Sequence, residues 1–309
     1  MDKVLIKKHN GQTTDTVLMV RPAAFGYNEE TAVNNAFQQE GQGADIPGTA
    51  RKESDAYIQL LRDSGINVIA VVDTAVPHTP DSVFPNNWFS THEDGTLVLY
   101  PMFAENRRLE RKPAAIEAIR SNSDVRRTVD LTHYEEEGMF LEGTGSMVLD
   151  RVSRIAYACR SPRTSETVLE DFCSRLGFSP VLFEAADKVG RQIYHTNVMM
   201  HVGSRIAVVC MEAVRDAGQR AALRSSLEDA GKTVMEISFD QMEHFAGNML
   251  ELHDRNGEPC LVMSLAARDA LSEEQTGLLS DGMKLITPDL GCIELNGGGS
   301  ARCMIAELF

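Results

Sequence analysis

The sequence predicts an α/β fold of about five small modules that close around a pseudo-symmetry axis. Two observations lead to this prediction. Short β-hairpins recur along the chain, and each is followed by an amphipathic helix and one apolar strand. The recurrence is roughly every 50 to 60 residues, a spacing at which internal repeats determine a fold. A plain α/β sheet with added hairpins is the alternative interpretation.

Each hairpin consists of an apolar strand, a turn signal and a second apolar strand. Residues 87–90, for example, lead through Glu93-Asp94-Gly95 to residues 97–100. Three further hairpins of this kind begin near residues 146, 197 and 248. In a closed ring, the start of every hairpin would face the same axis.

Helical segments separate the hairpins, because apolar residues recur there at the spacing of one helix face. Several of them end at a glycine, as helix C-termini prefer: Gly65, Gly177 and Gly231. The expected helices are 52–62, 107–119, 165–176, 217–227 and 265–279, and the strands after them are 67–72, 125–131, 180–183, 233–237 and 285–286. No linker or low-complexity tract divides the chain, so we expect one domain over residues 1–309.

The composition excludes several classes of protein. The chain has 309 residues, of which 43% are hydrophobic and 24% charged, as in ordinary soluble proteins. A net charge of -15 argues against nucleic acid as a partner. We expect no membrane span, because no run of about 18 apolar residues occurs. Residues 1–4 lack the apolar stretch of a signal peptide.

The six cysteines form no CxxC pair, which argues against a zinc ribbon or a thioredoxin-like site. Their distribution through apolar strands favours free thiols in a reducing compartment. We therefore expect a cytoplasmic protein. The sequence leaves homo-oligomerisation open.

Cys303 is the candidate nucleophile. It follows the glycine run 297–299, where backbone can approach a neighbour closely, and it adjoins Arg302, whose charge favours a thiolate. The alternative is a buried thiol that behaves as a small hydrophobic residue. Thiol chemistry also needs a proton shuttle and a group that orients the shuttle or the substrate. His195 and Glu142, at the starts of two other hairpins, supply both.

Each of these partners has a structural alternative. His195 could be a buried structural histidine, and Glu142 could bond to nearby backbone amides. His244 is the main rival to His195, whereas His201 is expected to be exposed near a turn. No HxH, HExxH or Cys/His cluster occurs, so we expect no metal and no organic cofactor.

These residues, in this order, resemble the guanidino-group-modifying superfamily, also known as the amidinotransferase or pentein fold. It includes arginine deiminases, dimethylarginine hydrolases and amidinotransferases. The resemblance covers essentially the whole chain and rests on Leu141-Glu142-Gly143, His195-x-Asn197 and the glycine-led Cys303. It implies a five-bladed αβ propeller in which Cys303 is the nucleophile, His195 the acid/base and Glu142 the motif glutamate.

Two departures from the family pattern concern the substrate. Members that act on guanidinium usually carry carboxylates where this chain has Asn87 and Asn197. Two amides cannot neutralise a guanidinium, but their donors and acceptors suit a neutral ureido group. The segment 33–38 also resembles the citrulline-hydrolase branch. We therefore expect hydrolysis of citrulline to ornithine, ammonia and carbon dioxide.

An amino-acid substrate also needs its carboxylate held, a task for which arginine is suited. Family members place arginines in stretches that match Arg163 and Arg108 here, although both could be solvated charges at helix starts. Asn86 and Asn248 complete the expected substrate-binding set, and residues 25–28 are a candidate lid. Two other functions stay open: an arginine or methylarginine deiminase or hydrolase, and a non-catalytic propeller that binds an amino acid.

Overall fold

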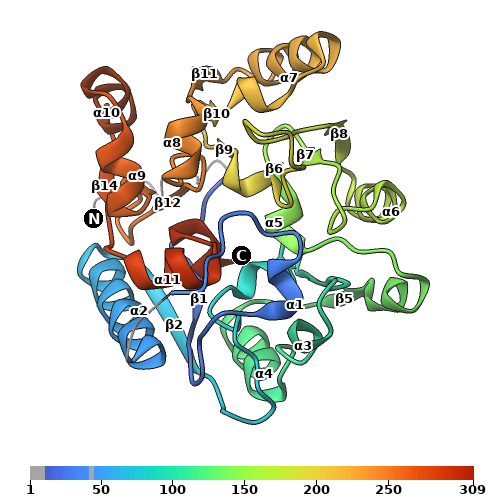
Figure 1. Cartoon of the computed structure of the whole chain (residues 1–309), viewed down its shortest axis with the longest axis vertical. Coiled ribbons are helices and arrows are strands. Elements are labelled where there is room, and N and C mark those ends of the chain that lie inside the picture. Colours follow the sequence, from blue (N-terminus) through green and yellow to red (C-terminus); the bar gives the residue numbers. More distant parts are fainter. Residues whose placement is uncertain (1–10, 42–44) are drawn as a thin grey trace, which may run out of the picture.

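The computed structural model describes residues 11–41 and 45–309. The first residues, on which the expectation about a signal peptide rests, lie outside the described residues. Within the described residues the strands form five three-stranded sheets. The sheets are arranged around a central axis with helices at the periphery (Figure 1). This is the five-bladed αβ propeller that the resemblance implied.

Every blade has the same topology, an inner strand antiparallel to a middle strand that is parallel to an outer strand. The inner strands are neighbours near the axis, since β3 contacts β15 and β9 contacts both β6 and β12. In the order inner, middle, outer, the blades are β15 (Ala306–Leu308), β1 (Thr16–Arg21), β2 (Asn67–Val72); β3 (Phe89–Thr91), β4 (Thr96–Leu99), β5 (Arg127–Asp130); β6 (Met147–Asp150), β7 (Ile155–Cys159), β8 (Ser179–Phe183); β9 (Met200–Val202), β10 (Ile206–Val209), β11 (Thr233–Glu236); and β12 (Leu250–His253), β13 (Pro259–Val262), β14 (Lys284–Ile286).

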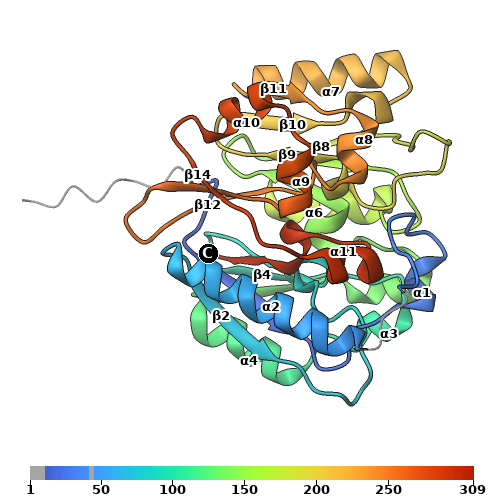
Figure 2. The same cartoon turned by 60° about the vertical axis from the view of Figure 1, so that its left-hand side comes forward.

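The peripheral helices cross from the middle to the outer strand of each blade, because two parallel strands need such a connection. They are α2 (Ile46–Asp63), α4 (Pro113–Asn122), α6 (Glu166–Leu176), α7 (Ala217–Asp229) and α10 (Glu273–Ser280), of which α2, α4 and α10 are preceded by the shorter α1 (Glu29–Ala32), α3 (Glu105–Arg108) and α9 (Leu265–Ala270). The short helices α8 (Phe239–Glu243) and α11 (Gly291–Gly297) instead lead from an outer strand to the next inner strand. Figure 2, which turns the view, shows α7 at one edge of the molecule and α2 and α4 at the opposite edge.

Two helices expected to be continuous are each divided in two. The segment 107–119 divides into α3 and α4, because Lys112 is extended and Pro113 begins a new helix. The segment 265–279 divides into α9 and α10, because Ser272 forms a capping box with Gln275 and starts the second helix. The expected glycine helix ends are confirmed, since Gly65, Gly177 and Gly231 all have positive φ.

The blade of β15, β1 and β2 joins distant parts of the chain. β15 pairs antiparallel with β1, with Thr16 opposite Leu308 and Leu18 opposite Ala306. The Oγ1 of Thr14 adds a 2.6 Å hydrogen bond to the carbonyl of Leu308. The sequence repeat revealed four hairpins because the two strands of this one have no turn between them. This pairing closes the ring and places residues 301–304 at its axis.

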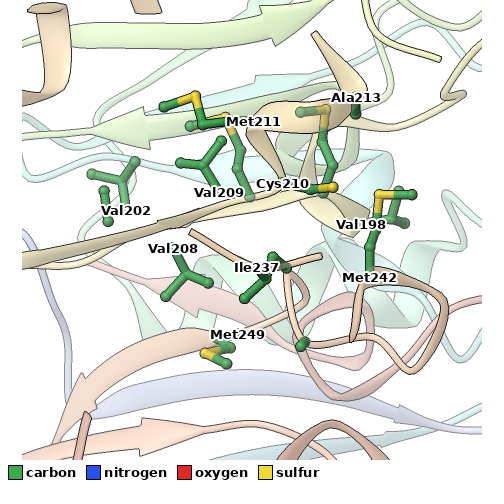
Figure 3. Packing of buried hydrophobic residues seen from close by; sticks show 14 of the residues in the cluster. Val198, Val202, Val208, Val209, Cys210, Met211, Ala213, Ile237, Met242 and Met249 are labelled. Atoms are coloured by element: carbon green, nitrogen blue, oxygen red, sulfur yellow. The ribbon is translucent and has the colours of Figure 1, made fainter. Parts of the chain in front are cut away.

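The hydrophobic core lies within and between the blades. Figure 3 shows part of the cluster around β9 and β10, where Met211, Met242 and Met249 pack with valines from neighbouring segments. Methionine fills irregular gaps well, which suits the junctions between blades. All six cysteines are free thiols, as expected. Among the described residues, no helix is long and apolar enough to span a bilayer.

Replacing Leu308 with alanine tests the closing strand. Leu308 is 2% exposed, and deleting a buried leucine side chain costs about 2–5 kcal/mol. We expect the free energy of unfolding, measured by urea denaturation, to fall by that amount. Leu278→Ala is the control, because Leu278 is 37% exposed on α10, and it should change stability by about 0.5 kcal/mol or less. Equal losses in the two variants would contradict a stabilising role for the closing strand.

Candidate active site

A short turn precedes the inner strand of each blade and faces the axis. These turns are η1 (Pro85–Asn87), α5 (Gly143–Ser146), η3 (Thr196–Val198), the loop 244–249 and η5 (Ala301–Met304). They, or the residues directly before them, carry the polar side chains that the sequence singled out. The structure therefore brings together, at one end of the axis, Asn87, Glu142, His195, Asn197, Asn248 and Cys303.

Glu142 is fully buried and is the electrostatic centre of the cluster. Its Oε2 lies 2.7 Å from His195 Nε2, 3.4 Å from Arg163 Nη1 and 4.0 Å from Arg107 Nη1. Its Oε1 accepts a hydrogen bond from the Phe103 amide at 3.0 Å. Burial alone would raise the pKa of Glu142, but Arg163, His195 and Arg107 hold that pKa well below its usual range. Glu142 is therefore a carboxylate at neutral pH.

The carboxylate fixes how His195 is protonated. Burial lowers the pKa of His195 to about 4, although Glu142 opposes the shift. The imidazole is thus neutral at neutral pH, and its Nε2 must carry the proton, because the ionised Glu142 can only accept. Nδ1 keeps the lone pair and can act as a base. Glu142 does bond to a backbone amide, as its structural alternative expected, but it also holds the His195 ring.

Two amides hold the sulfur of Cys303. Asn248 Nδ2 donates to Cys303 Sγ at 3.3 Å, and Asn197 Nδ2 lies 3.5 Å from the same atom. The neighbouring Arg302 is also buried, but its guanidinium bonds to the Ile305 carbonyl and to Glu307. The positive charge of Arg302 is thus paired with Glu307 of the same segment.

Buried polar atoms without a hydrogen-bond partner remain on the turns that carry the site residues. Arg107 Nη1 donates to Asn87 Oδ1 at 2.8 Å, which leaves Asn87 Nδ2 unpaired. Asn197 Oδ1 and Asn86 Oδ1 are also unpaired, whereas Asn86 Nδ2 donates to Thr144 Oγ1. A buried polar atom without a partner is costly. These atoms are therefore candidates to bond with a polar ligand.

Glycines allow the site to be this crowded. A Cβ at Gly145 would lie 2.4 Å from Asn87 Nδ2 and 2.8 Å from His195 Nδ1, so both groups lie against this glycine. In the run before Cys303, a Cβ at Gly299 would lie 2.9 Å from the Phe84 ring. Gly298 has φ +63°, and its Cβ would lie 2.6 Å from Asn35 Nδ2. The expected close backbone approach at 297–299 is confirmed.

The segment 28–41 covers this end of the axis, and Arg163 is tied to it. Arg163 Nη2 donates to the Thr31 carbonyl at 2.7 Å, and Nε donates to Asn34 Oδ1 at 2.8 Å. Asn35 bonds to the Gly297 carbonyl. With Glu142 as its third partner, Arg163 is 2% exposed. The expectation that it binds a substrate carboxylate stays a prediction, and it requires the contacts to Thr31 and Asn34 to break.

The remaining predicted residues have mixed outcomes. Arg108 is half-buried, bonds to the Met102 and Phe103 carbonyls and lies over the Phe140 ring, so its carboxylate role stays a prediction. In the candidate lid 25–28, Phe25 is buried in the core and Asn28 belongs to the covering segment, so the role of these residues as a lid stays a prediction. The expectation for His201 is wrong, because it is 4% exposed. His244 ends α8 and bonds to the Asp240 carbonyl.

Sequence analysis missed Arg107 and Asp81. Arg107 forms a bidentate pair with Glu110 and fixes Asn87. Asp81 Oδ2 accepts from Asn28 and Thr31 of the covering segment, while Oδ1 is unpaired. The i,i+3 spacing of Arg107 and Glu110 was the available signal, but it favours an exposed helix pair equally well.

Two surface clefts border the covering segment. One, of about 470 Å³, is lined by residues 32–36, Pro162 and Gln192, and the other, of about 560 Å³, is lined by residues 242–245 and Leu295. Ala36 and Arg191 line both. Within residues 11–41 and 45–309, no group of three His, Cys, Asp or Glu side chains is placed to hold a metal ion.

Comparison with known proteins agrees with this architecture. A family model described as "N,N dimethylarginine dimethylhydrolase, eukaryotic" matches residues 21–309. The chain belongs to this dimethylarginine dimethylhydrolase family. It is therefore an enzyme of the amidinotransferase, or pentein, superfamily, as the resemblance implied. No curated protein matches the chain in sequence.

Several solved structures share the fold of this chain although their sequence identity to it is low. The substrate-bound N-terminal domain of ArgZ, an arginine dihydrolase from cyanobacteria, has TM-score 0.75 and 17% identity, covering 95% of this chain and 97% of the other. A complex of AgrE with L-arginine has the same TM-score and identity, covering 95% and 40%. A dimethylarginine dimethylaminohydrolase adduct with S-methyl-L-thiocitrulline has TM-score 0.66 and 15% identity, covering 95% and 99%.

Buried histidines should make the protein lose stability in mild acid. Burial lowers the pKa of His195 to about 4 and of His201 to about 3, and it also lowers the pKa of His92. Below about pH 6.5 each of these three histidines therefore binds more protons in the unfolded chain than in the folded one, so each lowers stability as pH falls, whereas Glu110, whose pKa burial raises to about 7, has the opposite effect. Each group contributes up to about 1.4 kcal/mol per pH unit.

Urea denaturation between about pH 6.5 and about pH 4.5 measures this slope, in a range where the unfolded histidines titrate. We expect His201→Gln to flatten it, because one of the three contributions is removed. His244→Gln, at an exposed position, should leave the slope as it is. An unchanged slope in His201→Gln would contradict the neutral buried state.

Proposed function

We propose that this protein hydrolyses a C–N bond at the terminal carbon of an arginine-like amino acid through Cys303, and that its preferred substrate carries a neutral ureido group, as citrulline does. The observation that carries this choice is the orientation of Asn87. The family membership supports the reaction class, and the amides around Cys303 support the ureido group.

The unpaired atom of Asn87 is Nδ2, a donor. Its Oδ1 is used by Arg107, which has no acceptor atom, so the amide cannot turn round without placing two donors together. The unpaired Nδ2 therefore suits the carbonyl oxygen of a ureido group. A guanidinium carries only N–H donors and would leave Asn87 Nδ2 without a partner, at a cost of about 1–3 kcal/mol.

Asn197 complements Asn87. Its Nδ2 is turned toward Cys303 Sγ, and its unpaired Oδ1 can accept from the ureido –NH2. One amide would then hold the carbonyl oxygen and the other the nitrogen, with the carbon presented to the sulfur. The full charge of Glu142 is already balanced by Arg163 and Arg107. A guanidinium would thus have to share the Glu142 carboxylate with these two arginines.

The first half of the proposed reaction forms a thioester-like intermediate. His195 Nδ1 takes the proton from Cys303, and the thiolate attacks the ureido carbon. The tetrahedral adduct collapses as the bond to the terminal nitrogen breaks, and His195 returns the proton to the departing ammonia. Glu142 keeps the imidazole oriented and stabilises its transient positive charge. A thiocarbamate joins Cys303 to the rest of the substrate.

The second half consumes water. His195 Nδ1 takes a proton from a water molecule, whose oxygen attacks the thiocarbamate carbon, and the Cys303 thiolate leaves. The carbamate so released divides into the amine and carbon dioxide. The balance is citrulline and water in, and ornithine, ammonia and carbon dioxide out. Arg108, and Arg163 once freed from the covering segment, are the proposed partners of the substrate carboxylate.

A guanidino substrate is the second candidate, and the comparisons favour it over citrulline. The family model is described for dimethylarginine, and the solved structures with this fold include an arginine dihydrolase and an arginine complex. Arginine or a methylarginine would use the same Cys303, His195 and Glu142, with ammonia or a methylamine as the first leaving group. Asn87 Nδ2 would then face a donor.

A substrate panel tests the proposal directly. Purified protein is incubated with citrulline, arginine and dimethylarginine, and ammonia, methylamines, ornithine and citrulline are measured. We expect ornithine from citrulline, with a higher kcat/KM than for either guanidino compound. Cys303→Ala should abolish turnover while the protein stays folded. Citrulline accumulating from arginine would establish the second candidate, and no turnover of any compound would favour the non-catalytic amino-acid-binding propeller.

Asn87→Asp tests the substrate choice. The carboxylate can keep its bond to Arg107 and offer an anionic acceptor to the ligand. We expect the ratio of kcat/KM for arginine to that for citrulline to rise about tenfold or more, and further when Asn197→Asp is added. Asn296→Asp is the control, since this buried amide bonds within α11 and to Gly41. A ratio that stays constant in Asn87→Asp would remove Asn87 as the specificity residue.

A further inference from the structure

Asn248 has a place in the site that substrate binding does not account for. It is fully buried, and both ends of its amide already bond to the protein. Its Nδ2 donates to Cys303 Sγ at 3.3 Å and to the Asn197 carbonyl at 2.8 Å. In the described structure it therefore faces the nucleophile rather than open space, and its expected role in binding substrate stays a prediction.

The orientation of this amide is fixed by the backbone of the nucleophile's own turn. Asn248 Oδ1 accepts from the Arg302 amide at 3.0 Å. The Arg302 N–H can only donate, so Oδ1 must face it and Nδ2 must face the sulfur. The hydrogen bond to Arg302 thus fixes the Asn248 Nδ2 donor relative to η5, the turn that carries Cys303. Such preorganised donors are effective where negative charge has to be stabilised.

We propose that Asn248, with Asn197, stabilises the thiolate that Cys303 forms when His195 Nδ1 takes its proton, and that Asn248 is a catalytic residue that sets the reactivity of the sulfur. The inference builds on the proposed function, since it assumes that Cys303 is the nucleophile. The two donors reach the same atom from neighbouring blades, one from η3 and one from the loop before β12. A charged sulfur gains more from such donors than a neutral thiol does.

Other ionisable groups around Cys303 come from several elements. Tyr57 of α2, Tyr194 before η3 and Arg302 of η5 all interact with it electrostatically. Burial raises the pKa of both tyrosines and lowers the pKa of His195 to about 4. The tyrosines and His195 therefore stay neutral near neutral and mildly alkaline pH, and Glu142 stays ionised. The effect of a substitution at Asn248 on the titration of Cys303 can thus be distinguished from the titration of these neighbouring groups.

The test is the pH dependence of Cys303 alkylation by iodoacetamide, followed by mass spectrometry of the peptide that contains Cys303. The midpoint of the rate against pH reports thiolate formation and does not depend on how open the site is. Asn248→Ala should raise the midpoint by about one pH unit, the effect of one hydrogen bond to a charged group.

Asn248→Asp is the sharper variant. It keeps the acceptor for the Arg302 amide and nearly the same shape, but it places a carboxylate oxygen against the sulfur. Its midpoint should rise further than that of Asn248→Ala. Asn296→Ala, which removes a buried amide that does not touch Cys303, should leave the midpoint unchanged. Thermal melting of each variant shows that the compared proteins are folded.

The outcomes separate this inference from the proposed function. Folded Asn248→Ala and Asn248→Asp proteins whose midpoints equal that of the wild type would overturn the role of Asn248. If the midpoints shift as expected but neither citrulline nor arginine is turned over, the role of Asn248 stands and the proposed substrates fall. If Asn248→Ala does not fold, Asn248→Asp alone decides.

Discussion

The pairing of β15 with β1 is the constraint on which both the ring and the site depend. Four blades take their inner and middle strands from consecutive segments, but the remaining blade takes them from opposite parts of the chain. The residues just before β15 are Cys303 and its turn, so the same strand pairing that closes the ring places the sulfur on the axis. Fold stability and the position of the nucleophile are consequently set by one set of contacts.

The buried charges at the axis form a second level of organisation. Glu142 is ionised in the protein interior because Arg163 and Arg107 lie beside it, and removing one member of such a group leaves an uncompensated charge. Arg107 in turn orients Asn87, and Arg163 ties the covering segment to the same carboxylate. The protonation of His195, the direction of the Asn87 amide and the closed position of residues 28–41 are therefore coupled through Glu142.

The sequence predicted the features that local patterns encode. The four hairpins, the glycine-ended helices and the trio of Cys303, His195 and Glu142 all follow from short motifs and their spacing. Arg107 was missed because adjacent arginines look alike in sequence, and only the turn of α3 decides that Arg107 enters the core while Arg108 stays at its edge. The contacts of Asn34 and Asn35 with Arg163 and Gly297 join segments far apart in the chain, where no local signal exists.

Cys303 follows the strands of the other four blades in the sequence, and this order also has a consequence for biosynthesis. Translation is vectorial, so the hairpins that carry Asn87, Glu142, His195 and Asn248 all emerge from the ribosome before the sulfur and the strand that closes the ring. A nascent chain that has not yet reached Cys303 contains Glu142 and His195 without the sulfur. The sulfur therefore joins the site together with β15, the strand that closes the ring.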